Sequence, residues 1–196
     1  DDEHDDLIES IEGEVPLLTQ TSVMATPVNT TPVTAVHEES VFDLITAGLN
    51  ALNRGEIQTA TDLLSDALDW EPQNVEARLS RGQCLRDRGD IAGAMSDFLK
   101  AEQAAPHSCE PQVEIGNLFF SKKDYGRAIV HYTEALSIHP GHAMAMCRRG
   151  ISFYHRRQPN QALDDLKAAK AIDASIPNID RYITMVTRRN RASSPR

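Results

Sequence analysis

The sequence predicts an all-α fold built from stacked helical hairpins, and three regularities carry this prediction. Glycine recurs every 34 residues, a pair of alanines follows each glycine, and a proline closes most units. A fixed period in this range is typical of stacked supersecondary units, not of one globular core. The glycine column is Gly48, Gly82, Gly116 and Gly150, and the two alanine columns are Ala60, Ala94, Ala128 and Ala162, then Ala67, Ala101, Ala135 and Ala169.

Each unit contains two predicted helices joined by a short turn. The two alanines of a unit are seven residues apart, so they share one face of the second helix and let the first helix approach closely. Gly favours the end of a helix, Asp caps the start of the next, and Pro is tolerated in a first turn. These turn signals are Gly55-Glu56, Gly89-Asp90, Lys123-Asp124 and Arg157-Gln158-Pro159. The second helices end before Pro72, Pro106 and Pro140, with Ala174 in the fourth slot.

This pattern resembles the tetratricopeptide repeat, a helix-turn-helix unit with the same period. Four repeats fit, at 41–74, 75–108, 109–142 and 143–176. The family's large residue between the alanines is Phe98 or Tyr132 in the middle repeats and Leu64 or Leu166 in the outer ones. Its early Trp is absent, and its slots hold Leu44, Arg78, Gln112 and Met146. The resemblance implies a right-handed superhelical solenoid and is specific for fold more than for function.

The ends of the array differ from the repeats in composition. Ile176, Ile179, Ile183 and Val186 recur at helical spacing, which predicts a capping helix over 177–190, with Arg181, Arg188 and Arg189 on other faces. Residues 1–40 hold ten Asp and Glu and no Lys or Arg, against 19 acidic and 20 basic residues in 41–196. This acidic, Pro- and Thr-rich leader has the composition of a disordered segment, and 191–196 is a short basic tail.

A column of large apolar residues lies near the end of the second helices. Trp70, Ile138 and Ile172 share it, with the small Ala104 between them. We expect these side chains to form apolar contacts between repeats, because buried aromatic residues usually serve packing. A ligand-binding Trp70 is the alternative.

The sequence offers no recognisable catalytic constellation. No Gly-rich phosphate loop or nucleophile motif occurs in its expected context, so we predict that the chain is not an enzyme and binds no cofactor or metal. His139-Pro140-Gly141-His142 has metal-like spacing but falls on a turn between repeats. Asp164 and Asp165 are adjacent on one helix, where side chains diverge by about 100° and form no dyad, so a solvated face is expected there.

In proteins of this kind the first helices of successive repeats line a concave groove, and the resemblance implies which residues line it here. Gln83 and Asn117 share a column, and their amides can donate to and accept from an extended peptide backbone. They are either ligand contacts or solvated polar positions between helices. The expected peptide-groove residues are Leu79, Gln83, Arg86, Glu110, Val113, Asn117, Phe120, Cys147, Ile151 and Tyr154.

One subfamily uses Lys, Arg and Asn in this groove to clamp the acidic C-terminus of heat-shock chaperones. Its slots are filled here by Ile45, Leu49, Ser80, Glu110 and Glu114, and starting one repeat later recovers only Arg148. Carboxylates in these slots repel an acidic tail. We therefore predict a scaffold within a larger assembly that binds an apolar or basic-amphipathic peptide or helix, and not a carboxylate-clamp adaptor.

Three alternatives remain open at this point. The chain could be an architectural subunit of a ciliary, trafficking or organellar complex that contacts its neighbours through its convex face and ends. Nucleic-acid binding is disfavoured, because 41–176 carries 15 basic against 18 acidic residues and phosphate contact needs a positive surface. The leader's Leu7, Ile8 and Ile11 could occupy the chain's own groove, or dock on another protein.

Cysteine usage and hydropathy indicate the compartment. Cys84, Cys109 and Cys147 are an odd number without a CxxC pair, which favours a reducing compartment such as the cytoplasm, nucleus or cilium. No apolar run approaches the ~18 residues of a transmembrane helix, so no membrane insertion is expected. Because the first residue is Asp1, we expect a piece of a longer protein or a processed product.

Overall fold

The computed structural model describes residues 40–193, with side chains up to residue 190. The predicted leader up to residue 39 and the end of the basic tail, 194–196, lie outside the described residues. The described residues cluster within one compact unit, Glu38–Arg196. The boundaries of leader, repeats, cap and tail therefore remain predictions.

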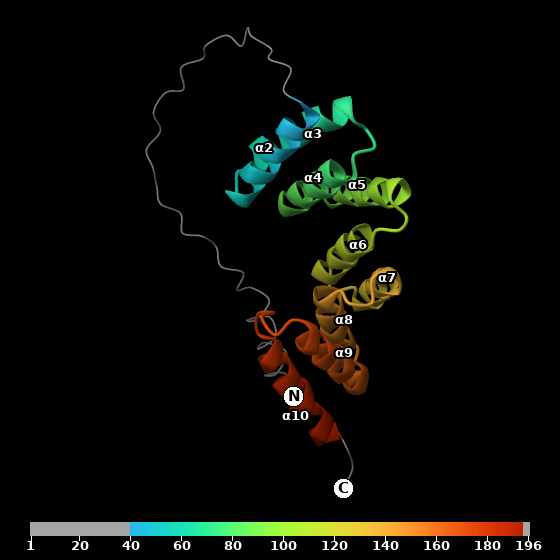
Figure 1. The fold of residues 1–196 in the computed structure, drawn as a ribbon. Helices are drawn as coiled ribbons and strands as arrows, with labels where there is room; N and C mark the ends of the chain where they lie inside the picture. The colour runs from blue at the N-terminus through green and yellow to red at the C-terminus, as the bar shows by residue number, and fades with distance from the viewer. Residues whose placement is uncertain (1–39, 194–196) are drawn as a thin grey trace, which may run out of the picture. The chain divides into compact units, whose positions relative to one another are not determined.

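The described residues form helices and turns only, as the sequence predicts (Figure 1). Each repeat contributes a first and a second helix, and one further helix follows the fourth repeat. The elements are α2 (Val41–Asn53), α3 (Ile57–Trp70), α4 (Val75–Asp87), α5 (Ile91–Ala104), α6 (Glu110–Ser121), α7 (Tyr125–Ile138), α8 (Ala143–His155), α9 (Pro159–Ile172) and α10 (Ile179–Ser193).

The helices pack in chain order. Each first helix packs against its own second helix, and each second helix packs against the first helix of the next repeat, while α10 packs against α9. The first helices α2, α4 and α6 also contact one another in sequence. This nearest-neighbour packing is that of an all-α repeat solenoid and confirms the predicted fold class.

The glycine and alanine columns mark the closest contact within each repeat. A Cβ on Gly82 would lie 2.4 Å from Cε1 of Phe98, and one on Gly150 would lie 3.0 Å from Cγ of Leu166. The eight signature alanines are 0% exposed, as are the four large residues that face the glycines. Glycine is therefore required because a large side chain of the second helix occupies the space of its missing Cβ.

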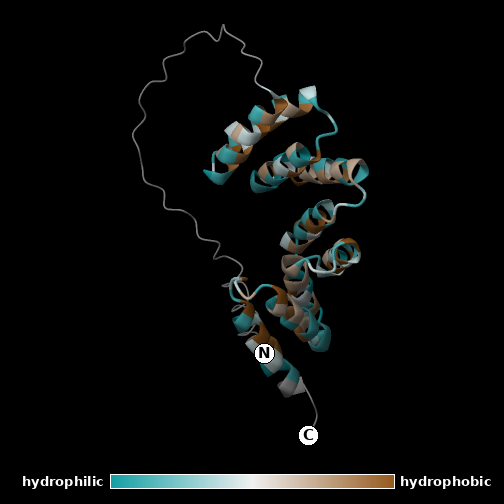
Figure 2. Ribbon diagram, viewed as in Figure 1, coloured by the Kyte–Doolittle hydropathy of each residue, from teal (hydrophilic) through white to brown (hydrophobic). Residues whose placement is uncertain are grey.

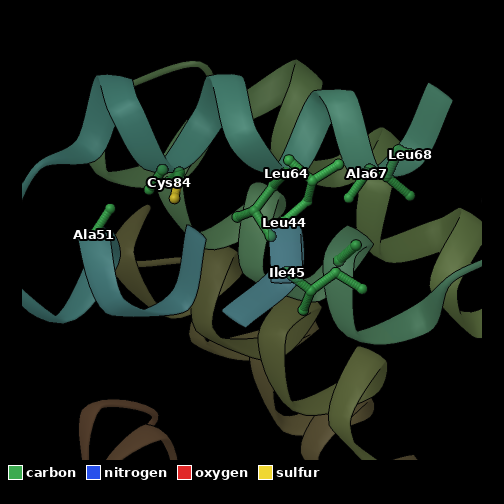
Figure 3. Packing of buried hydrophobic residues seen from close by; sticks show 9 residues of the cluster. Leu44, Ile45, Ala51, Leu64, Ala67, Leu68 and Cys84 are labelled. Atoms are coloured by element: carbon green, nitrogen blue, oxygen red, sulfur yellow. The ribbon is translucent and has the colours of Figure 1, made fainter. Parts of the chain in front are cut away.

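Each buried cluster extends from one repeat into the next. The cluster of the first repeat joins Leu44 of α2 and Leu64 of α3 to Cys84 of α4 (Figure 3). A second cluster joins Phe98 of α5 to Ile115 of α6. The helices carry both apolar and polar residues, so each presents one face to its neighbours and another to solvent (Figure 2).

The turns between first and second helices repeat one backbone conformation. Gly55 and Gly89 have φ of 76° and 86°, and the equivalent Lys123 and Arg157 have φ of 57° and 59°. This left-handed conformation is easy for glycine and costs energy for other residues. The predicted caps are confirmed where they are aspartate: Asp90 and Asp124 accept hydrogen bonds from the N–H groups of Gly93 and Arg127, at 2.9 and 3.1 Å.

A partly buried ion pair joins the two helices of the second repeat and the two helices of the fourth. The Arg81 guanidinium donates two hydrogen bonds of 2.8 Å to Asp97, and Arg149 donates two of 2.7 and 2.8 Å to Asp165. The prediction of a solvated face is therefore wrong for Asp165, because α8 and α9 bring a fork-shaped donor against its carboxylate. Asp164 is exposed, as predicted.

Two of the four slots of the family's early Trp hold polar side chains that reach the preceding repeat, Arg78 and Gln112. Arg78 is buried, donates to the carbonyl oxygen of Pro72 and lies 3.6 Å from Asp97. Gln112 is buried and donates to Glu102 at 2.8 Å. In the second and third repeats this slot therefore connects neighbouring repeats although the aromatic ring is absent.

The column of Trp70, Ile138 and Ile172 does not form the predicted core. Trp70 is 76% exposed, Ile172 is 52% exposed and Ile138 is 40% exposed. These residues end or nearly end their helices, and the buried signature alanines and large residues form the contact between helices instead.

The capping helix is present as α10, two residues later at its start than predicted. Ile179 and Val186 are buried, together with the preceding Ile176. Arg181 and Arg188 are exposed as expected. Arg189 differs, because its guanidinium lies 4.9 Å from the centre of the Tyr154 ring.

Replacing Gly82 by alanine is expected to destabilise the fold by about 1–3 kcal/mol, because the new Cβ overlaps the buried Phe98 ring. Urea unfolding followed by circular dichroism measures the change. Gly141→Ala is the matched control, since its Cβ would meet only His139 at 3.5 Å, and it should change stability by less than about 0.5 kcal/mol. Equal effects of the two variants would contradict this account of the glycine column.

Replacing Arg157 by glycine is expected to stabilise the fold by about 0.5–1 kcal/mol, because it relieves the left-handed backbone conformation. Its neighbour Arg156 has φ of −80°, so Arg156→Gly serves as the control and should not stabilise. Thermal and urea unfolding of both variants test the difference. A loss of stability in Arg157→Gly would show that the turn is not strained.

Candidate functional site

The first helices of the second and third repeats are joined by a polar bridge centred on Glu114. Gln83 Nε2 donates to Glu114 Oε1 at 3.0 Å, and Arg86 Nη1 donates to Glu114 Oε2 at 2.7 Å. The Glu114 side chain is 15% exposed and that of Arg86 is 27% exposed. The carboxylate is therefore held by two donors of α4 in a partly desolvated setting, where charge-assisted hydrogen bonds are strong.

Asn117 extends this bridge toward the second helix of its own repeat. Its Nδ2 lies 3.4 Å from Glu114 Oε2, and its Oδ1 accepts a 2.8 Å hydrogen bond from the buried Tyr132 hydroxyl. Burial raises the pKa of Tyr132, so this hydroxyl remains a donor. Gln83 and Asn117 thus have internal partners, an arrangement that the sequence pattern did not reveal because it joins three helices.

The expected groove residues differ in accessibility. Leu79, Gln83, Arg86, Asn117 and Phe120 are half-buried and Glu110 is exposed, and we call these six residues of α4 and α6 the first-helix face. Four others are buried and cannot contact a ligand in this conformation, namely Val113, Cys147, Ile151 and Tyr154. For Tyr154 the cover is Arg189 of α10.

The expected repulsion of acidic ligands is only partly upheld. Arg86 compensates the charge of Glu114, so this carboxylate does not act as a free negative charge on the surface. Glu110 remains exposed, accepts from the Ser108 hydroxyl, and this hydrogen bond lowers its pKa. The first-helix face therefore carries one accessible carboxylate, that of Glu110.

A row of aromatic rings and arginines lies on the third and fourth repeats and the cap. Arg148 lies 5.5 Å from the centre of the Phe120 ring, and the Phe120 and Tyr125 rings are 5.5 Å apart. The Tyr125 and His155 rings stack at 4.0 Å, and His155 lies 5.9 Å from the Tyr154 ring. We call this row the basic–aromatic edge: Phe120, Tyr125, Arg148, Tyr154, His155 and Arg189.

The three cysteines are buried thiols. Their exposures are 0% for Cys84, 3% for Cys109 and 2% for Cys147, and none of them forms a disulfide. Burial raises the pKa of each, to about 11 for Cys147. A thiol of this kind is a poor nucleophile at neutral pH, because the thiolate is the reactive form.

The histidine turn has a structural role. His142 Nδ1 accepts a 3.1 Å hydrogen bond from the N–H of Ala145 and so caps the start of α8. His139 Nδ1 lies 4.0 Å from Cys109 Sγ. Among residues 40–190 no group of three or more His, Cys, Asp or Glu side chains is arranged to hold a metal ion.

No helix in the described part of the chain is both long enough and apolar enough to cross a membrane. What these residues present is a series of side-chain surfaces on packed helical hairpins. They define the class of protein, an array of packed α-helical hairpin repeats.

The chain belongs to the tetratricopeptide repeat family. The family model for the tetratricopeptide repeat matches residues 45–108 and 113–177, each a pair of consecutive repeats. This family consists of protein-interaction modules, and no catalytic family is indicated.

Known relatives extend well beyond this chain. Human tetratricopeptide repeat protein 13 is 29% identical over 135 residues, covering 69% of this chain and 15% of its own length. Human DnaJ homolog subfamily C member 7 is 29% identical over 151 residues, covering 69% and 29%. The solved structure of PilF from Pseudomonas aeruginosa has a TM-score of 0.72 at 18% identity over 79% of this chain and 71% of its own, a likeness of fold alone.

Stability is expected to fall at alkaline pH through Cys147. The folded-state pKa of Cys147 is raised from 9.0 to about 11, so the folded protein binds this proton more tightly than the unfolded chain. The contribution of the thiol is fully present below the unfolded pKa near 9 and is lost as pH rises through about 11, a total of about 2–3 kcal/mol.

Urea unfolding at several pH values between about 7 and 11 tests this, with Cys147→Ala as the comparison. The stability difference between the two proteins should shrink as pH rises. Cys84, Cys109 and Tyr132 have pKa values raised in the same direction, so both proteins keep a residual decline. A difference that is independent of pH would contradict the prediction.

Proposed function

We propose that this chain is a protein-binding scaffold whose first-helix face binds an apolar or basic-amphipathic segment of a partner protein. The observation that carries the proposal is that the half-buried apolar residues Leu79 and Phe120 lie on the same two helices, α4 and α6, as a polar bridge whose hydrogen bonds are made within the chain. A preformed surface of this kind loses little conformational entropy on binding. Apolar side chains of a partner helix or strand gain by covering Leu79 and Phe120.

Charge supports the basic-amphipathic preference. Glu110 is exposed on this face, whereas Arg86 is paired with Glu114. A lysine or arginine on the partner segment can pair with the accessible carboxylate of Glu110. An acidic partner segment finds no such counterpart, because Arg86, the basic residue of the first-helix face, is already paired with Glu114. This differs from the carboxylate clamp, which needs several free cations.

A second function is favoured by the exposed apolar residues of the second helices. Leu99 is 43% exposed and Val130 is 52% exposed, in addition to Trp70 and Ile172. An architectural subunit that buries its second helices against neighbours would use these side chains and leave the first-helix face open. The two functions therefore use different helices, so substitutions on one set of helices can distinguish them.

Substitution of Leu79 by aspartate is expected to weaken partner binding at least tenfold, or about 1.4 kcal/mol, because it places a charge in the apolar contact. The tagged full chain is used for affinity purification, the captured proteins are identified by mass spectrometry, and binding of the identified segment is measured by calorimetry. Leu99→Asp on α5 is the matched control and should bind as the unmodified chain does.

The control also distinguishes the two functions. Loss of the partner with Leu99→Asp and retention with Leu79→Asp would replace the first-helix proposal with the architectural one. Thermal unfolding of both variants checks that the aspartate has not unfolded the repeat, since both sites are at least partly exposed.

A further inference from the structure

Charge is polarised along the array. The first repeat, 41–74, carries one basic against six acidic residues, whereas 143–196 carries eleven basic against four acidic residues. The exposed turns between first and second helices show where part of this basic charge lies.

A column of basic residues runs along these turns. Each first helix of the four repeats ends at a basic residue in its C-cap position, where a positive charge stabilises the helix dipole. The members of the column repeat every 34 residues and are all exposed, namely Arg54, Arg88, Lys122 and Arg156. A shared structural role explains the column itself, but it does not explain the differences between its members.

The charge around the column changes from one half of the array to the other. In the five residues centred on each member, basic and acidic residues balance one to one at 52–56 and two to two at 86–90. The ratio is two to one at 120–124 and two to none at 154–158. We call 120–124 and 154–158 the cationic turns.

The carboxylates beside the column neutralise it unequally. Arg54 pairs with Glu56 at 2.8 Å. Asp124 accepts hydrogen bonds from the N–H and the guanidinium of Arg127, which lower its pKa, and the charge of Arg156 acts on it more weakly. Within residues 40–190 no ion pair reaches the exposed cations Lys122, Arg156 and Arg157.

The two cationic turns lie side by side. The ring of Tyr125, which directly follows the first turn, stacks on the ring of His155 in the second, with their centres 4.0 Å apart. Arg156 Nη1 lies 3.0 Å from the place that a Cβ on Gly126 would take, at the start of α7. The cations of both turns therefore belong to one continuous surface.

Each cationic turn also places a basic residue in an unfavourable backbone conformation. Lys123 and Arg157 have φ of 57° and 59°, where the first two repeats have Gly55 and Gly89. Glycine adopts this left-handed conformation at a lower cost. Backbone strain of this kind occurs preferentially at functional sites, so the basic side chains in these positions point to a role for their charge.

We propose that the two cationic turns together bind an acidic segment of a partner protein. Carboxylates of the segment pair with Lys122, Arg156 and Arg157, and such charge-assisted hydrogen bonds are stronger than neutral ones. The site uses none of the residues of the first-helix face. It therefore goes beyond the function proposed above, which concerns an apolar or basic-amphipathic segment.

The surroundings favour an acidic peptide over a nucleic acid. Single-stranded nucleic acids bind where bases can stack on open aromatic rings. Here Arg148 lies 5.5 Å from the centre of the Phe120 ring, and Arg189 lies 4.9 Å from that of Tyr154. Residues 41–176 also carry 15 basic against 18 acidic residues, so a long polyanion that extends past the cationic turns meets repulsion.

The test measures the fluorescence anisotropy of a labelled peptide that is titrated with the full chain. The peptide consists of four repeats of Glu-Asp-Ser, and the reference peptide has Gln and Asn in place of the acids. Titrations are made at about 0.05 M and about 0.5 M salt, because salt screens charge pairing. The acidic peptide is expected to bind at low salt and to lose at least about tenfold in affinity at high salt, and the reference peptide should not bind.

The variant K122E/R156E is expected to weaken binding of the acidic peptide at least about tenfold, because it reverses two of the pairing charges. The control R54E/R88E makes the same change in net charge at the equivalent C-cap positions, and it should weaken binding less than about threefold. Loss of the helix-dipole interaction is common to both variants. Leu79→Asp should leave peptide binding unchanged, which separates this site from the first-helix face.

Arg157→Gly gives a second readout. It is expected to stabilise the fold, because it relieves the left-handed conformation, and to weaken peptide binding at least about threefold, because it removes a cation. A variant that is more stable but binds less tightly cannot owe its loss of binding to unfolding. Circular dichroism checks that the charge-reversal variants remain folded.

Four results would overturn the proposal. The first two are an absence of salt-sensitive binding of the acidic peptide and equal weakening by K122E/R156E and R54E/R88E. The third is tighter binding of a single-stranded oligonucleotide with the same number of charges, which would assign the cationic turns to nucleic acid. The fourth is loss of the peptide in Leu79→Asp with retention in K122E/R156E, which would place the acidic segment on the first-helix face.

Discussion

The close approach of the two helices in each repeat is the constraint on which the rest of the structure depends. Each first helix carries a glycine against which a large buried side chain of the second helix packs, as Phe98 does against Gly82. The signature alanines keep the same interface narrow, and all of them are fully buried. Because every repeat solves this contact in the same way, the hairpins have matching shapes and can stack into a continuous array.

The polar contacts, unlike this packing, differ from repeat to repeat. Arg81 and Arg149, which are 68 residues apart, each bind an aspartate of their own second helix and a hydroxyl of the preceding repeat, Ser65 and Thr133 at 3.3 and 3.2 Å. The contact between successive first helices varies too. Arg86 meets Glu114, and the equivalent pair one repeat later is Phe120 and Arg148. Equivalent positions thus give a neutralised ion pair in one place and a cation on a ring in the next.

Because the polar and aromatic side chains differ between repeats, the surface of the array differs in character along its length. Repeats two and three present apolar side chains beside a satisfied polar bridge, whereas repeats three and four and the cap present arginines and rings. In a repeat array each unit contacts only its neighbours, so surfaces of different character can coexist without sharing a core. The acidic first repeat and the basic C-terminal end are two such regions, and their opposite charge gives the molecule an electrostatic polarity.

The sequence by itself determined the helix order, the buried glycine, alanine and large-residue columns, and the presence of a capping helix, because these follow from local spacing and packing size. It did not determine which polar groups meet. Glu114 is 31 residues from Gln83 and 28 from Arg86, and such pairs depend on helix rotation and side-chain reach. The exposure of Trp70, the burial of Val113 and Ile151 and the contact of Arg189 with the Tyr154 ring depend likewise on which helices pack around each position. Only the tertiary structure fixes that packing, so it alone decided which of the expected groove residues remain accessible.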